Sequence, residues 1–220
     1  MKTFTEPLKE LEGFQQIREK LKKNRGVMQV SGCIEAQKSH FMYCAGEGYR
    51  YRVILTHSDL QAREIYENYR FFDRKVLLYP ARDLMFYNAD IQSHQIAGQR
   101  MAVLRALLEE EEVTVITTLP GCMERLLPLS VLRENVLEFF PDSTVDLQNL
   151  SLRLSQMGYE KAAQVEVPGQ FAVRGGIIDI FELTGETPVR IELWGDEIDS
   201  IRSFDAESQR SIENLESVRI

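Results

Sequence analysis

The sequence predicts an α/β domain with a parallel sheet, followed by a smaller α+β domain with antiparallel strands. In residues 1–131, short apolar runs alternate with segments of helical periodicity, the pattern of a parallel sheet covered by helices on both faces. In residues 132–220, one helical segment precedes several short strands separated by glycine-containing turns, which indicates antiparallel pairing. We therefore predict two domains, 1–131 and 132–220.

The elements of the first domain follow from the spacing of apolar residues. Spacings of three and four predict helices over 8–21 and 96–110, a helix that runs to Ala45, and a helix that begins at a cap formed by Ser58 or Asp59 and ends near Tyr69. Continuous apolar runs predict strands over 27–30, 51–55, 75–79 and 113–117. The alternation of the two types supports the parallel sheet.

The second domain is predicted to contain one helix over 146–157 and five strands. The strands are expected over 164–167, 171–174, 177–183, 189–194 and 198–204. Tight turns are expected at Gly175-Gly176, Thr184-Gly185 and Gly195-Asp196, because glycine accepts the backbone angles that such turns require.

Composition excludes several classes of protein. The chain contains no apolar run of about 18 residues, so no membrane helix and no membrane partner are expected. The charged residues 1–25 lack the apolar segment of a secretory signal. The three cysteines and three histidines show no paired spacing, so we expect no metal site and a reducing, cytoplasmic location.

Charge is distributed unevenly along the chain. Residues 1–131 hold 18 Lys+Arg and 17 Asp+Glu, whereas residues 132–220 hold 8 and 17. Because an acidic surface repels a phosphate backbone, the second domain favours a protein partner over nucleic acid. The basic residues between 18 and 25 are interpreted as a solvated helix end.

A segment of the first domain has the position of a phosphate-binding loop but departs from its pattern. Gly32 is followed, at the expected spacing, by Gln37, Lys38 and Ser39, so the second glycine of the motif is replaced by Gln37. A side chain there intrudes where the backbone would wrap around a phosphate, and Glu35 adds repulsion. We expect a degenerate, inactive nucleotide loop; residual ATP binding that depends on Lys38 is the alternative.

The strand over 189–194 is a candidate for an interface. Because side chains alternate along a strand, Val189, Ile191 and Leu193 should face the core while Arg190, Glu192 and Trp194 face outward. By the same alternation, Arg174 should lie on the outer side of its own strand. Tryptophan and arginine are enriched at interface hot spots. In the alternative interpretation, Trp194 covers a second small core and the arginines pair with Glu192 or Asp196.

Long motifs in this region resemble a known family. The segments 167–181, 190–202, Phe204-Asp205 and 208–211 resemble the module shared by the excision-repair helicase subunit UvrB and the transcription-repair coupling factor Mfd. The chain is most similar to the N-terminal UvrB-homology region of the coupling factor, because Gln37 disrupts the phosphate loop and the stretch 79–88 is too short for the DNA-inserting hairpin of UvrB. The resemblance implies a first domain like domain 1a of UvrB and a second like its domain 2.

The resemblance also implies a function. The second domain would recruit the damage-sensing protein UvrA through Arg174, Arg190 and Trp194, and the chain itself would have no catalytic residues and no cofactor. The parent protein would be a cytoplasmic translocase that uses ATP and Mg²⁺ and binds RNA polymerase and double-stranded DNA through other regions. Independently of the resemblance, an exposed Trp–Arg surface needs cover in a soluble protein, so we expect other domains of the parent to cover it until polymerase is engaged. A fragment of a UvrB-like, ATP-binding helicase subunit is the alternative.

Overall fold

The computed structural model describes residues 6–23, 26–82, 89–109 and 111–220, and these form two compact units. Unit 1 comprises Met1–Asp83 and Ala102–Glu124, and unit 2 comprises Leu84–Met101 and Arg125–Ile220. The break at residue 124 lies near the predicted boundary, but residues 84–101, assigned to the first domain from the sequence, group with unit 2. The stretch 79–88, predicted to be too short for a DNA-inserting hairpin, lies partly outside the described residues.

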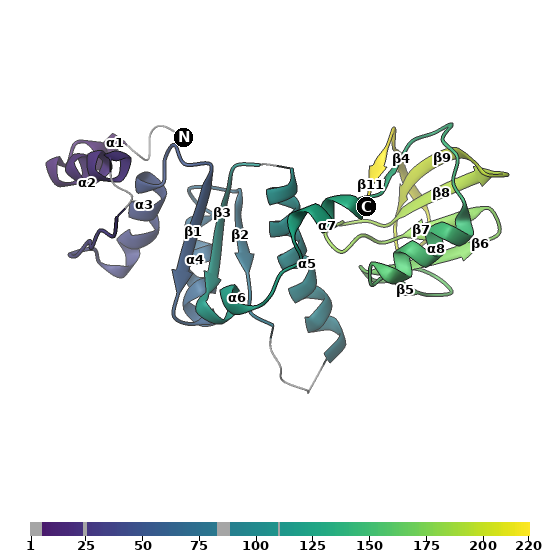
Figure 1. Cartoon of the computed structure of the whole chain (residues 1–220), viewed down its shortest axis with the longest axis horizontal. Coiled ribbons are helices and arrows are strands. Elements are labelled where there is room, and N and C mark those ends of the chain that lie inside the picture. Colours follow the sequence, from purple (N-terminus) through teal and green to yellow (C-terminus); the bar gives the residue numbers. More distant parts are fainter. Residues whose placement is uncertain (1–5, 24–25, 83–88, 110) are drawn as a thin grey trace. The chain divides into compact units, whose positions relative to one another are not determined.

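A three-stranded parallel sheet organises unit 1. Its strands are β1 (Tyr51–Thr56), β2 (Val76–Tyr79) and β3 (Val113–Thr118), with β3 in the centre (Figure 1). The helix α4 (Asp59–Tyr69) covers one face, where Ile116 is fully buried. The opposite face packs against the C-terminal half of α5 (Ala89–Leu108) through Val103 and Ala106. The predicted parallel sheet with helices on both faces is therefore confirmed.

The remaining helices of unit 1 differ in part from the prediction. They are α1 (Glu6–Lys9), α2 (Glu12–Lys23), α3 (Glu35–Ala45) and α6 (Leu119–Met123). The helix expected over 8–21 is therefore interrupted between α1 and α2, and the prediction did not include the short helix α6. Ser58 caps α4 as expected, because its side chain accepts a hydrogen bond from the backbone N–H of Gln61.

The strand predicted over 27–30 is wrong. No strand is present in this part of the chain, and both Val27 and Val30 are exposed. An apolar run becomes a strand only where a neighbouring strand satisfies its backbone groups and a core receives its side chains. Neither is available here.

A six-stranded sheet dominates unit 2. Its order is β10-β9-β8-β7-β6-β5, and its neighbours are antiparallel except for the parallel pair β5–β6. The strands are β5 (Glu160–Lys161), β6 (Gln170–Arg174), β7 (Ile177–Ile180), β8 (Val189–Trp194), β9 (Glu197–Phe204) and β10 (Ser211–Asn214). A separate pair is formed by β4 (Glu138–Phe139) and β11 (Val218–Arg219). The predicted antiparallel α+β unit is confirmed.

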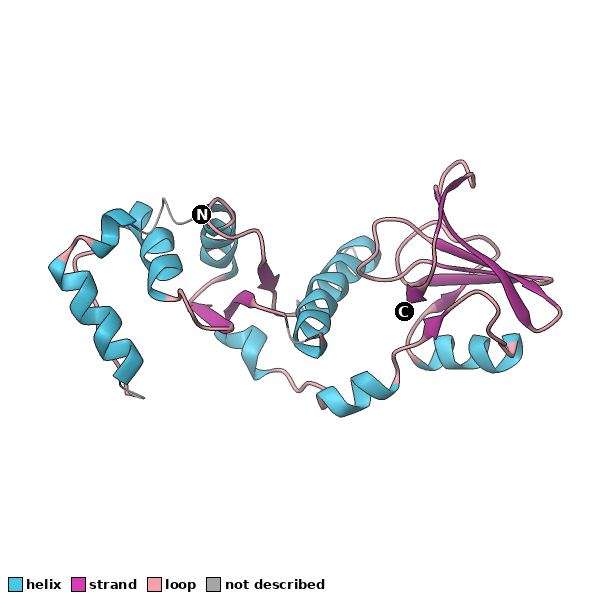
Figure 2. Cartoon of the chain, turned by 90° about the horizontal axis from the view of Figure 1, so that it is seen from above, coloured by secondary structure: helices cyan, strands magenta, loops and turns pink. Residues whose placement is uncertain are grey.

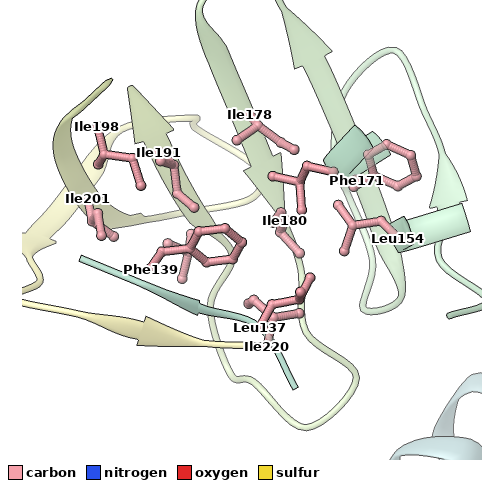
Figure 3. Packing of buried hydrophobic residues seen from close by; sticks show 12 residues of the cluster. Leu137, Phe139, Leu154, Phe171, Ile178, Ile180, Ile191, Ile198, Ile201 and Ile220 are labelled. Atoms are coloured by element: carbon pink, nitrogen blue, oxygen red, sulfur yellow. The ribbon is translucent and has the colours of Figure 1, made fainter. Parts of the chain in front are cut away.

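The main core of unit 2 lies on one face of this sheet. The helix α8 (Leu147–Gln156) lies along the sheet (Figure 2) and contributes the fully buried Leu154, whereas α7 (Leu129–Glu134) contributes no buried residue. Asp146 caps α8 by accepting hydrogen bonds from two backbone N–H groups. Figure 3 shows the packing of Phe171 and the isoleucines of three adjacent strands: Ile178, Ile180, Ile191, Ile198 and Ile201.

The strand predicted over 164–167 is also wrong. The backbone N–H groups of Glu166 and Val167 donate to the side-chain oxygen of Gln170, at 3.0 and 3.3 Å, rather than to a neighbouring strand. Val165 is buried in a small cluster with Ala172, Phe181 and Ala206. A buried valine in a tight loop thus produced the strand-like pattern.

Candidate functional site

The segment that resembles a phosphate loop does not follow a strand. Gly32 has a φ of 94°, and residues 31–34 lead directly into α3. The Lys38 ammonium is paired with the carboxylate of Glu35, one turn earlier in the same helix, and Ser39 is buried. The predicted arrangement, in which the loop connects a strand to a helix, is corrected. The lysine is thus paired within the protein, and the serine is buried.

The predicted interface residues lie on the face of the six-stranded sheet opposite the main core. The register pairs Ala172 with Asp179, Asp179 with Arg190, and Arg190 with Arg202. Because paired residues in an antiparallel sheet share a face, these four side chains form a row across strands β6 to β9. We call this side of the sheet the outer face.

Asp179 is the centre of this row. Its side chain is fully buried, and it accepts three hydrogen bonds from two arginines. Arg190 contacts both of its oxygens, with Nε at 2.7 Å from Oδ1 and Nη2 at 3.0 Å from Oδ2. Arg174 contacts Oδ2 through Nη2 at 2.5 Å. One carboxylate thus faces two guanidinium groups, which leaves the cluster with net positive charge.

Arg190 is held from several sides. Its guanidinium lies over the ring of Phe204, 4.4 Å from the ring centre, and its Nη2 donates to Oε1 of Gln209 at 3.0 Å. The hydrogen bonds to Asp179 raise the pKa of Arg190 above its ordinary value, against the opposing effect of burial. The side chain is only 16% exposed. The prediction that this guanidinium points into solvent is therefore wrong, although the residue does lie on the outer face.

Arg174 and Trp194 are the exposed members of the predicted set. The side chain of Arg174 is 43% exposed and uses one of its five N–H groups in the contact with Asp179. Trp194 is 86% exposed at the end of β8, and Leu193 packs against the main core, as the alternation predicted. The small second cluster, around Val165, does not include the indole.

The alternative pairing of the arginines is partly resolved by these contacts. Both Arg174 and Arg190 pair with Asp179, whereas Glu192 pairs with Arg202 and accepts a hydrogen bond from Ser200. The outer face therefore carries two ion-pair clusters side by side. Only the cluster around Asp179 has more arginines than carboxylates.

A two-residue turn positions the indole. Trp194 pairs with Glu197 across Gly195-Asp196, and Gly195 has a φ of 65°, which glycine adopts without strain. The backbone oxygen of Asp196 accepts a hydrogen bond from Val145 at 2.7 Å, and residues 142 and 143 bond to Ile198. The hairpin is thus held by a segment outside its own two strands.

A second turn presents Gln209 to Arg190. Asp205 accepts hydrogen bonds from the backbone N–H and the hydroxyl of Ser208, at 2.8 and 2.6 Å, and these contacts lower the pKa of Asp205. Gln209 adopts a left-handed φ of 59° and donates to the backbone oxygen of Ala206 at 2.8 Å. The turn therefore fixes the backbone of Gln209 and also the amide group at the end of its side chain.

Sequence reasoning missed Asp179 and Gln209. Asp179 could have been found, because the Gly175-Gly176 turn fixes the β6–β7 register and the residue alternates with the core residues Ile178 and Ile180. Gln209 gave no such indication, since its position depends on the conformation of a loop.

Comparison with known proteins identifies unit 2. The family model described as "UvrB interaction domain" matches residues 137–220, the range that contains the outer-face cluster and Trp194. Residues 137–220 are a UvrB interaction domain. The resemblance recognised in the motifs of this region is confirmed. Within the matched range, the strand β4 pairs with the strand β11.

Relatives extend the similarity into unit 1. The chain is 37% identical over 169 residues to the transcription-repair-coupling factor of Bacillus subtilis, which covers 76% of this chain and 14% of the relative. It is 38% identical over 148 residues to the factor of Staphylococcus epidermidis and 39% identical over 152 residues to that of Staphylococcus aureus, covering 67% and 69% of the chain. The chain thus spans only 13–14% of the length of these relatives. In the described part of the chain, no helix combines the length and apolarity needed to cross a membrane.

Proposed function

We propose that this chain is the UvrA-recruiting part of a transcription-repair coupling factor, with the outer face of the UvrB interaction domain as the contact surface. The observation that carries the proposal is the combination of an 86% exposed tryptophan with a cluster of two arginines around one carboxylate. An exposed indole offers a large apolar contact area, and a guanidinium offers paired donors to carboxylates. This combination is typical of interface hot spots.

The charge of the domain supports a protein partner of matching chemistry. Residues 132–220 are strongly acidic, yet the Asp179 cluster carries net positive charge. A local positive site on an acidic domain favours a partner that presents carboxylates around an apolar pocket. Arg174 and Trp194 would contact the partner directly. Arg190, which is largely buried, would support them through its hydrogen bonds to Asp179.

The place of the chain in a longer protein is part of the proposal. We assign unit 1 to a domain like domain 1a of UvrB and unit 2 to one like its domain 2. The parent would be a cytoplasmic, ATP-driven translocase. It would bind RNA polymerase and double-stranded DNA through regions other than the one that this chain matches. Its other domains would cover the outer face until polymerase is engaged.

Recruitment is tested by calorimetric titration of this chain with purified UvrA. The variant with Arg174→Ala, Arg190→Ala and Trp194→Ala together should lose measurable binding. Leu152→Ala is the matched control, since Leu152 is 59% exposed on α8 rather than on the outer face, and it should bind like the wild type. Undiminished UvrA affinity in the triple variant would contradict the proposal.

We also propose that the chain does not hydrolyse ATP by itself. The pairing of Lys38 with Glu35, the burial of Ser39 and the glutamine at position 37 support this assignment. Titration with ATP and Mg²⁺ should give no heat of binding for the wild type. Saturable binding that is removed by Lys38→Ala would instead favour a UvrB-like, nucleotide-binding fragment.

A further inference from the structure

We infer that Asp179 is a positioning residue for partner recognition, which aims Arg174 at the partner and locks Arg190 behind it; this inference rests on the function proposed above. Asp179 itself has no exposed side-chain surface, so it cannot contact a partner. Its effect on binding must pass through the two arginines that donate to it.

The burial of Asp179 indicates why a carboxylate is present at this position. Removing an ionised carboxylate from water is costly, and a buried ion pair commonly contributes less to stability than apolar residues of similar size would. The neighbouring position in the register is the buried Ala172, so an apolar side chain is compatible with this row. A charged residue here is better explained by the orientation of the arginines than by the stability of the sheet.

The geometry gives the two arginines different roles. Arg190 donates twice to Asp179 and once to Gln209, lies over Phe204 and is 16% exposed, so few of its donors can reach a partner. Arg174 donates once to Asp179 and keeps 43% of its side chain exposed. Because a held side chain loses less entropy on binding than a mobile one, the contact with Asp179 should increase the affinity that Arg174 provides.

Gln209 completes the arrangement from the far side. It accepts from Arg190 at 3.0 Å and donates to Ala206, while the Asp205–Ser208 contacts order its turn. Asp179 and Gln209 thus hold Arg190 from two directions. Arg190 contacts both oxygens of Asp179, whereas Arg174 contacts only Oδ2 and keeps more of its side chain exposed.

The first test is titration of the 220-residue chain with UvrA. Asp179→Asn should weaken binding by about tenfold, the factor expected when a charge-assisted orientation is lost. Glu138→Gln is the matched control, because it removes the same charge from an ion pair with Arg219 in the separate β4–β11 pair, not on the outer face. Equal loss of affinity in both variants would overturn the inference in favour of a general charge effect.

A double-mutant cycle separates positioning from folding. If Asp179 acts through Arg174, then Asp179→Asn should have almost no further effect on UvrA affinity in a chain that already carries Arg174→Ala. Fully additive losses would overturn the inference. Should Asp179→Asn fail to fold, Gln209→Asn replaces it, because asparagine tolerates the left-handed φ but is too short to reach Arg190. That variant should weaken binding by roughly threefold, the scale of one hydrogen bond, and wild-type affinity would count against the inference.

A measurement without any partner makes the outcome independent of the proposed function. In the wild-type chain, the Nε–Hε group of Arg190 should exchange slowly with water, and ¹⁵N relaxation should report a rigid Arg174 side chain. Both properties should be lost in Asp179→Asn and kept in Glu138→Gln. If the wild-type chain did not bind UvrA, the proposed function would fail, and this measurement alone would decide whether Asp179 positions the arginines; unchanged arginine signals would refute it.

Discussion

Replacing Trp194 with alanine should separate recognition from stability. The indole is 86% exposed and belongs to neither buried cluster of unit 2, so its removal leaves the folded core unchanged. Surface substitutions of this kind change the free energy of unfolding by about 0.5 kcal/mol or less. Urea denaturation of Trp194→Ala should therefore give the wild-type midpoint within error.

The effect on UvrA affinity should be far larger. A tryptophan side chain at this exposure has on the order of 200 Å² to bury in a complex. At ~25 cal/mol per Å², that area corresponds to an upper bound of about 5 kcal/mol. Association and side-chain ordering oppose part of this gain, so we expect a loss of about 2–3 kcal/mol, or roughly 30- to 150-fold in Kd.

The assay is calorimetric titration with UvrA, with Leu152→Ala as the control for the loss of an exposed apolar side chain elsewhere. Wild-type affinity in Trp194→Ala would refute the reasoning, because no other residue of the predicted set offers a comparable apolar area. A decrease of more than about 1 kcal/mol in the free energy of unfolding would also refute it, since the indole would then be part of the packing.

Two further substitutions and two measurements on Cys44 test the structure. Leu154→Ala removes a fully buried side chain from the main core of unit 2 and should lower the free energy of unfolding by about 2–5 kcal/mol in urea denaturation. Gly176→Ala places a Cβ 2.9 Å from the backbone oxygen of Leu193, so β8 must shift; we expect a loss of about 1–3 kcal/mol and weaker UvrA binding, both absent if the strand adapts freely. Burial raises the pKa of the Cys44 thiol from 9.0 to about 11, so this thiol should react with iodoacetamide at pH 8 only on unfolding, whereas the exposed Cys122 reacts at once. Because the folded pKa is the higher one, the stabilising contribution of this thiol is fully present below pH 9 and is lost as the pH rises toward 11, which a pH series of unfolding midpoints would detect.

The elements of the central sheets could be predicted because their sequences carry two consistent patterns. The strand over 189–194 was predicted with its observed bounds, since apolar alternation and the Gly195-Asp196 turn define both its faces and its end. Short strands such as β4 and β11, with two residues each, were missed because so few residues show no periodicity. Their pairing depends on contacts between segments far apart in the chain.

The site was predicted in part. The sequence indicated its exposed residues but not the side chains within the protein that contact them. Alternation along one strand places Arg190 on the outer face, but it does not show that Asp179 of the adjacent strand reaches the guanidinium at 2.7 Å. Arg190 was expected in solvent for that reason. Side-chain contacts between strands require the register, and contacts from a loop residue such as Gln209 require the loop conformation.

The attachment of the β8–β9 hairpin to residues 142–145 has a consequence for kinetics. Since the turn beside Trp194 is fastened by backbone hydrogen bonds on two sides, the indole is presented on a rigid support before any partner arrives. A rigid support allows the encounter to proceed without a slow rearrangement of this domain, so association should follow a single exponential whose rate rises linearly with partner concentration. Differences among variants should then be expressed chiefly in how long the complex lasts.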